Sequence, residues 1–366
     1  MFKQALKVAG RPFWERLRFR IDAEIDVKTE PERAQVRIIG STISELKEQV
    51  ATLTAKINSF SPTLEDDAQE QAALQQEFEE RVATMIRQRI FVPSFPVADQ
   101  HAPFMEYSTC SATDLLHPVY ADMCAMLGLP PMYQRKFWEW AYIIHHLREA
   151  GMLSEGRRGL GFGVGKERLP ALFAKFGCQV TATDAPSEIG IASGWSTSNQ
   201  HSAALAELKF PEIVPDAIFD ARVTHQPCDM NAIDDSLRDF DFTWSSCCFE
   251  HLGDLEAGLQ FVINSVEKTL KPGGVAVHTT EYNLSSNDAT VESGGTVIYR
   301  KRDMEDLISR LRAEGHEVHS FVAAPHAHPL DFHVDAPPYI NNPHLKLRLA
   351  GYTTTSAGIC VRKKAY

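Results

Sequence analysis

The sequence predicts an α/β fold in which a mostly parallel, doubly wound sheet of seven strands follows a helical N-terminal extension. From about residue 153, short β-rich runs alternate with segments of helical periodicity. Nearer the N-terminus, apolar residues keep a heptad spacing. The 366 residues allow one full α/β domain and a smaller part. We divide the chain into a helical extension (1–95), a helical lead-in or substrate lid (96–152) and the α/β domain (153–366).

The composition excludes several classes of protein. A formal net charge of -11 argues against a nucleic-acid binder, which needs a basic face to neutralise phosphates. The seven cysteines contain no Cys-x-x-Cys pair, as is typical of reduced thiols in a cytosol. The sequence has neither an apolar run long enough to span a bilayer nor the apolar core of a signal peptide. We therefore expect a cytoplasmic protein.

The first 21 residues are basic within an acidic chain. They carry six Lys or Arg side chains against one acid, interleaved with aromatic and aliphatic residues. Such a segment is typical of peripheral contact with an anionic surface, here the inner face of the membrane. A helix that docks on the protein's own acidic surface is an equal alternative.

A predicted coiled-coil seam follows in residues 36–57. Its apolar positions alternate in steps of three and four, with β-branched residues at one core position. We expect a homo-oligomer formed through this seam; the alternative is a helix packed on its own domain. The seam residues are Val36, Ile39, Ile43, Leu46, Val50, Leu53 and Ile57.

The stretch from Arg158 to Asp184 organises the α/β domain. It reads as a strand, a glycine-rich turn, a helix and a second strand that ends in Asp184. Glycines allow close backbone approach to a ligand, and a carboxylate about 20 residues later is placed to accept hydrogen bonds from a ribose diol. The stretch predicts the nucleoside-binding half of a Rossmann-like fold. Tight packing without a ligand is the alternative.

The remaining elements follow in alternation. The helix at 136–150 precedes the first strand, and its aromatic residues either wall a pocket, with Tyr133 and Trp140 near substrate, or belong to the core. A Lys-Pro-Gly-Gly turn at 271–274 is a helix stop signal. We expect strands at 221–226, 240–246, 275–280, 317–322 and 353–362, and helices at 203–208, 255–270 and 304–314.

Residues 155–280 resemble class I S-adenosylmethionine-dependent methyltransferases, which implies that cofactor. The resemblance places the turn with Gly161, Gly163 and Gly165 under the methionine part, Asp184 at the ribose, and Asp229 and Met230 beside the adenine. Ser246 belongs to the segment 245–251, which resembles the loop between cofactor and substrate. The sequence departs from the family at Gly159, where an acid is usual; Glu250 or a backbone carbonyl would then hold the cofactor's amino group.

In an open parallel sheet, ligands bind beyond the carboxyl ends of the strands. His251 follows the fourth strand and is our predicted base, with Glu250 orienting it; alternatively, His251 caps the next helix. Glu281 is the next catalytic candidate, and His278 and Tyr282 are predicted to meet substrate at the same mouth.

A second polar cluster spans residues 326–335 and contains His326, His328 and His333. We expect a substrate-side loop in which histidines such as His333 hydrogen-bond hydroxyl groups, and no bound metal. A divalent cation that polarises a diol is the alternative, since imidazole and carboxylate are suitable ligands.

Together these observations predict methyl transfer from S-adenosylmethionine to a hydroxyl of a sugar or glycan-type acceptor, by a base-assisted reaction. N- or C-methylation of another small molecule is the leading alternative. A degenerate scaffold and a dehydrogenase with Asp184 on a nicotinamide ribose are the others.

Overall fold

The computed structural model describes residues 103–186 and 205–366, together with helical positions 47–52, 55, 74, 77, 78, 80 and 81. The chain divides into two compact units, residues 1–96 and 97–366. The basic segment 1–21 and most of the coiled-coil seam lie outside the described residues. Within the described part of the chain, no helix is long and apolar enough to cross a membrane.

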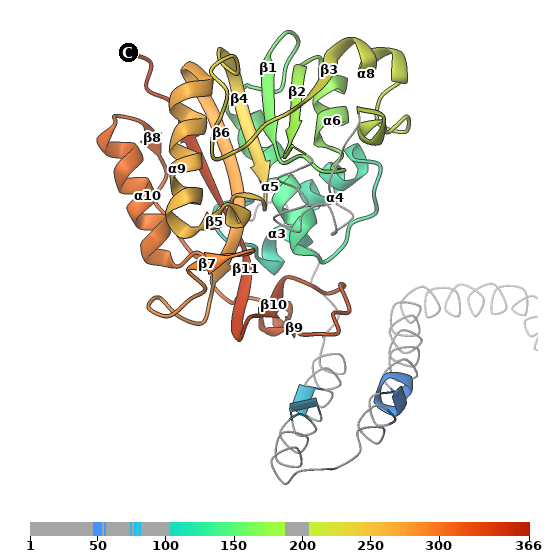
Figure 1. Cartoon of the computed structure of the whole chain (residues 1–366). Coiled ribbons are helices and arrows are strands. Elements are labelled where there is room, and N and C mark those ends of the chain that lie inside the picture. The colour runs from blue at the N-terminus through green and yellow to red at the C-terminus, as the bar shows by residue number, and fades with distance from the viewer. Residues whose placement is uncertain are drawn as a thin grey trace, which may run out of the picture. The chain divides into compact units, whose positions relative to one another are not determined.

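One mixed sheet forms the centre of the second unit (Figure 1). Five neighbouring strands run parallel in the order β3, β2, β1, β4, β6, so the order reverses between β1 and β4 as in a Rossmann fold. β11 is antiparallel to β6. Along the sheet the strands are β3 (Val223–Pro227), β2 (Gln179–Asp184), β1 (Arg158–Phe162), β4 (Phe240–Ser246), β6 (Leu270–Asn283), β11 (Tyr352–Arg362), β10 (Lys346–Leu349) and β9 (Val334–Asp335), with β8 (Glu317–Val318) also on β11.

The described residues thus place nine strands in this sheet, where we predicted seven. The additional strands are β9, at the end of the loop predicted for residues 326–335, and β10, in a segment for which we predicted no element. They are short, and β10 pairs with β11 through only four register positions. Two- to four-residue strands carry too little alternation to be recognised from sequence.

Helices cover both faces of the sheet (Figure 1). Phe173 of α6 packs edge-on against Trp244 of β4, and Tyr142 of α5 lies over Gly358 of β11, so α5 and α6 share one face. The opposite face carries α9 and α10. The helices are α3 (Ala112–Leu116), α4 (Pro118–Met126), α5 (Arg135–Glu149), α6 (Leu169–Lys175), α8 (Asp216–Arg222), α9 (Leu255–Asn264) and α10 (Lys301–Ala313).

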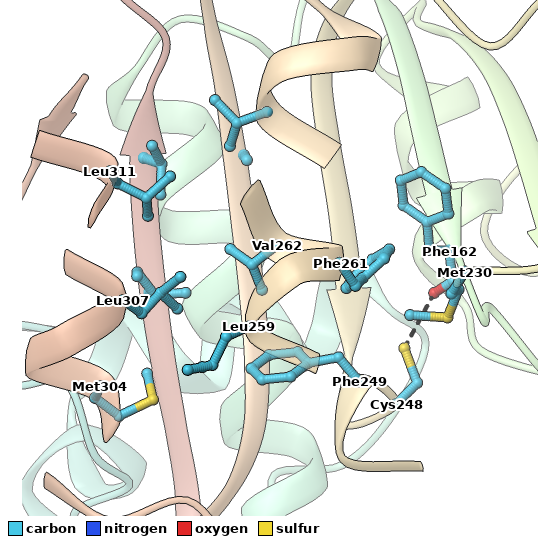
Figure 2. Close-up of a cluster of buried hydrophobic side chains, with 14 of the residues drawn as sticks. Phe162, Met230, Cys248, Phe249, Leu259, Phe261, Val262, Met304, Leu307 and Leu311 are labelled. Atoms are coloured by element: carbon cyan, nitrogen blue, oxygen red, sulfur yellow. Dashed lines mark hydrogen bonds between the residues drawn. The ribbon is translucent and has the colours of Figure 1, made fainter. Parts of the chain in front are cut away.

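The core beneath α9 and α10 is apolar and fully buried (Figure 2). Phe162 of β1 meets Phe261 of α9 edge to face, with ring centroids 5.1 Å apart. Leu307 and Leu311 of α10 complete the layer. Burial of such side chains stabilises the fold by about 1.5–3 kcal/mol each.

The predicted helix at 255–270 is shorter than expected. The α-helix ends at Asn264 and a π-helical turn spans Ser265–Thr269. The Ser265 hydroxyl donates to the Val262 carbonyl at 2.7 Å, and the Thr269 hydroxyl bonds to the Ser265 carbonyl. Such bonds from side chain to backbone compete with the α-helical ladder and loosen it.

Glycines in β1 make room for aromatic rings of β4. A Cβ at Gly159 would lie 2.3 Å from the Phe242 ring, and one at Gly161 would lie 2.4 Å from the Trp244 ring. Both rings are fully buried, so neither can move aside without repacking the core. Gly159 therefore stands where an acid is usual because the neighbouring strand fills the space.

We expect Gly161→Ala to lower the free energy of unfolding by about 1–3 kcal/mol, because overpacking a full core strains it. Urea unfolding followed by tryptophan fluorescence measures the change. Gly295→Ala is the matched control, since a Cβ there meets nothing within 4 Å. Equal stability of the two variants would contradict the packing role.

Candidate active site at the strand tips

The glycine turn after β1 is held by the acid that ends β2. Gly163 and Gly165 have φ of +57° and +51°, a left-handed conformation that favours glycine. The Asp184 carboxylate is 2% exposed and accepts backbone N–H bonds from Gly165 (3.1 Å) and Ala185 (2.8 Å). Asp184 thus fixes the turn.

Two further predicted segments meet this turn (Figure 2). A Cβ on Gly163 would lie 2.9 Å from Cys248 Sγ and 3.7 Å from Met230 Sδ. The Cys248 thiol donates to the Phe162 carbonyl at 3.5 Å. Asp229, beside Met230, is half-buried and accepts the Asn231 N–H at 2.9 Å. The ends of β1, β3 and β4 therefore converge.

A buried carboxylate on α5 anchors this region. Glu139 is 1% exposed. Its Oε2 lies 3.0 Å from Lys136 Nζ and accepts a 3.0 Å hydrogen bond from the Ser246 hydroxyl. Lys136 Nζ also donates to the Ser246 carbonyl at 2.8 Å. The first turn of α5 is thus bonded to the last residue of β4.

Arg135 extends the same network toward β6 and β11. Its Nη1 lies 2.9 Å from Glu281 Oε2, 3.1 Å from Ser356 Oγ and 3.6 Å from Cys247 Sγ. The Ser356 hydroxyl in turn donates to Glu139. The structure therefore brings three predicted residues into one polar cluster. Ser246 and Glu281 belong to it through direct contacts, and Glu250 through the electrostatic influence of its carboxylate on Arg135.

Cys247, Glu250 and Glu281 offer one possible metal-ligand atom each, all within 4.8 Å of one another. The Arg135 guanidinium already contacts Glu281 and Cys247. Burial raises the pKa of the Cys247 thiol well above its usual range, with Glu139 adding to the effect. Because the guanidinium is already paired with Glu281, we assign these residues to an ion-pair cluster. Cys247 has a φ of +53°, a strained conformation at the strand tip.

The cluster contains carboxylates of opposite character. Burial raises the pKa of Glu139, but Lys136 and Arg135 lower it further, so the net pKa is below the usual value. Burial raises the pKa of Glu281, and Arg135 offsets this only in part. Burial also raises the pKa of Glu167, in the turn after β1, to about 7. Its carboxylate accepts indole N–H bonds from Trp244 (2.8 Å) and Trp140 (3.2 Å).

Four predicted site residues lie elsewhere. His278 is fully buried between the hydroxyls of Ser245 (2.7 Å) and Ser265 (2.9 Å), and burial lowers its pKa to about 3. Its predicted position at the substrate mouth was wrong, because it points from the sheet toward α9 and packs against Phe261. Tyr282 belongs to the apolar core on that same face, so its predicted contact with substrate was wrong for the same reason.

His251 and His333 also stay outside the cluster. His251 Nδ1 lies 2.7 Å from the Gly295 carbonyl oxygen and 3.2 Å from the Thr296 hydroxyl. The next helix is capped by Asp254 instead. His333 is 3% exposed at the end of a 3-10 turn, Pro329–Phe332. Neither imidazole is brought to Glu281.

The polar loop 326–335 uses its acids for structure. Asp331 accepts backbone N–H bonds from Ala112 (2.9 Å) and His328 (3.0 Å) and lies 3.6 Å from Lys346 Nζ. Asp335 bonds His344 Nδ1 at 2.7 Å. These bonds attach the loop to α3 and to the segment before β10, which accounts for the acids without a cation.

The sequence analysis missed Arg135, Lys136, Glu139 and Glu167. One signal was available: Glu139 lies between Trp138 and Trp140 in the apolar stripe of a predicted helix. A carboxylate on a buried stripe needs a partner, and so marks a polar site.

Glu167 predicts a dependence of stability on pH. The folded state holds its proton up to about pH 7, whereas the unfolded chain releases it near 4.5, the ordinary value. Its contribution to stability is therefore lost as the pH rises from about 4.5 to about 7, by ~3 kcal/mol at most. Glutamine does not titrate, so we expect Glu167→Gln to remove this dependence. As the pH rises, the unfolding free energy of the wild type should then fall relative to that of the variant. Urea unfolding at pH 5 and pH 8 measures it. A constant difference would contradict the raised pKa.

No protein-family model matches the chain, and no curated protein matches it. Solved structures do. A 1,6-didemethyltoxoflavin-N1-methyltransferase from Burkholderia thailandensis matches at 15% identity over 68% of this chain and 81% of its own, with a TM-score of 0.34. A SAM-dependent methyltransferase from Methanosarcina mazei matches at 14% identity over 61% and 98%, with a TM-score of 0.35. The [4+2]-cyclase SpnF matches at 16% identity over 60% and 81%, with a TM-score of 0.36. Two of these three structures are named as methyltransferases, and the likeness of each to this chain is one of fold.

Proposed function

We propose that this protein transfers a methyl group from S-adenosylmethionine to a hydroxyl of a sugar or glycan-type acceptor. The observation that carries the proposal is the network in which the buried Glu139 is paired with the half-buried Lys136 and Arg135 beside the glycine turn. Buried charges are costly to desolvate and are commonly kept where a site needs them. Here they lie at the carboxyl ends of the strands, where open α/β sheets bind ligands.

The residues at these tips fit the chemistry of the cofactor. Asp184 and Asp229 offer acceptors for the ribose hydroxyls and the adenine amino group, and Met230 an apolar cover for the ring. The amino-acid end carries both charges, and Lys136 with Glu139 presents the opposite pair. We infer that Glu139, with Glu167 beyond it, takes the part of the acid replaced by Gly159.

When bound, the cofactor supplies a methyl group activated by its positive sulfur. The chain's own residues then have two tasks. They must align the acceptor oxygen, which forms the new bond to carbon as the carbon–sulfur bond breaks, and they must accept the hydroxyl proton. Glu281 suits the second task, because burial raises its pKa toward neutrality and makes the carboxylate a stronger base.

The cluster also supports the acceptor class. Hydroxyls of Ser246, Ser356 and Thr280 surround the carboxylates, and such a mixture of donors and acceptors suits a polyol. An amine acceptor is the second candidate, because Glu139, Glu250 and Glu281 together would favour a cation. Methylation at nitrogen and at oxygen differ in the product, so mass spectrometry with each acceptor class decides between them.

Calorimetric titration with S-adenosylhomocysteine tests the cofactor site. We expect micromolar binding to the wild type and a loss of roughly tenfold or more in Lys136→Met, the scale of a hydrogen bond to a charged group. Lys301→Met is the control, since Lys301 is an exposed residue of α10. Binding of nicotinamide dinucleotide instead, or of neither ligand, would contradict the proposal.

Turnover measurements test the proton acceptor. We expect Glu281→Gln to lower kcat by about 10²-fold with affinity for S-adenosylhomocysteine retained, because the amide cannot take the proton. His251→Ala should stay within a fewfold of wild type, since its ring faces Gly295. The reverse pattern would return the role of base to His251. The acceptor screen uses nucleotide sugars, free glycans and small amines.

A further inference from the structure

A cavity lies at the opposite end of α5 from the candidate active site. Its volume is about 700 Å³, within the range of small-molecule sites. His145, His146 and Glu149, from the last turns of α5, line it together with Val275 of β6 and Arg362 of β11. Lys136 precedes His146 by ten residues, about 15 Å along the helix. The cavity is therefore separate from the strand tips.

Residues 104–108 line one side of the cavity, and Ser108 fixes their position. The Ser108 N–H donates to the Val322 carbonyl at 2.8 Å, and its carbonyl accepts the Gly358 N–H at 2.8 Å. Phe104 is fixed by its contact with His145, edge to face at 5.2 Å, and by stacking on His117 at 4.9 Å.

The lining combines aromatic rings with negative charge. Phe104, Tyr107 and Tyr142 supply the rings. Glu106, Glu149 and Glu317 are exposed carboxylates of the lining, and Arg362 is its one arginine or lysine, so these four side chains carry a net charge of -2. Arg362 lies 3.9 Å from Glu317, and this pair offsets its own charges, which leaves Glu106 and Glu149 as the net negative charge.

We propose that this cavity binds a small organic cation with an aromatic or apolar body. A cation gains from the carboxylates, whereas an anion is repelled, and the aromatic side chains of the lining pack against an apolar body. The two helix histidines do not oppose it at neutral pH, because burial lowers the pKa of both and keeps them uncharged. This inference is independent of the proposed methyl transfer.

Calorimetry with 2-phenylethylammonium as the probe tests the proposal, and variants of the lining carboxylates assign the binding to this cavity. The neutral 2-phenylethanol and the anionic benzoate are the matched comparison ligands. We expect the cation to bind with a Kd of about 1 mM or lower, a typical strength for a fragment-sized ligand, and the other two to bind at least fivefold more weakly.

The double variant Glu149→Gln/Glu317→Gln should weaken binding of the cation roughly threefold to tenfold, because both carboxylates are exposed and screened by solvent. The control is Glu305→Gln/Glu314→Gln, which removes two exposed carboxylates of α10 and its C-cap, outside the lining. Equal binding of benzoate, no binding of the cation, or equal losses in the two double variants would overturn the proposal.

Discussion

The bonds of Glu139 to Lys136, Ser246 and Ser356 are the interaction on which the candidate site depends. Through them one carboxylate ties α5 to the last residue of β4 and to the interior of β11. An unpaired ion at this depth would cost several kcal/mol, whereas this ion accepts from Lys136, Ser246 and Ser356. Replacing such a network with apolar side chains often leaves stability unchanged, and we infer that these ion pairs position Arg135 and Lys136.

Packing below the site leaves no room for a side chain at Gly159. The aromatic rings of Phe242 and Trp244 lie where side chains at Gly159 and Gly161 would project. An acid at Gly159 would collide with the first ring. With that position closed, negative charge reaches the region from α5 and from Glu167, whose two indole donors include Trp244 itself. The same aromatic residue thus closes one route for an acid and supports another.

Much of the fold could be predicted from local patterns. Strands β1, β2 and β4 and the helices after them have clear periodicity, and the rule that ligands lie at strand tips directed attention to Glu250 and Glu281, whose carboxylates lie within 4.8 Å of each other. The alternation of side chains along a strand separates His278 and Tyr282 from them. His278 lies three residues before Glu281 and Tyr282 one residue after it, so both face α9 when Glu281 faces α5.

Other parts of the site could not be predicted in this way. Three residues of the site, Arg135, Lys136 and Glu139, belong to a helix that precedes β1. No local pattern shows that the first turn of this helix contacts Ser246 rather than another part of the sheet. Contacts such as Glu139 to Ser356 join residues 217 positions apart, and only the tertiary arrangement creates them. Strands β9 and β10 are too short to carry a period.

Helix α5 runs from the candidate active site to the cavity, and different interactions hold its two ends. Its first turn is bonded through charged side chains to β4, β6 and β11. Its last turns contact the segment 104–108, where the ring of His145 meets that of Phe104 edge to face. A ligand at one end changes the other only if it favours a different position of the helix. The ion pairs of the first turn and the close contact of Tyr142 with Gly358 in the middle of the helix oppose such a shift. The geometry therefore argues for two sites that share one rigid helix and act separately.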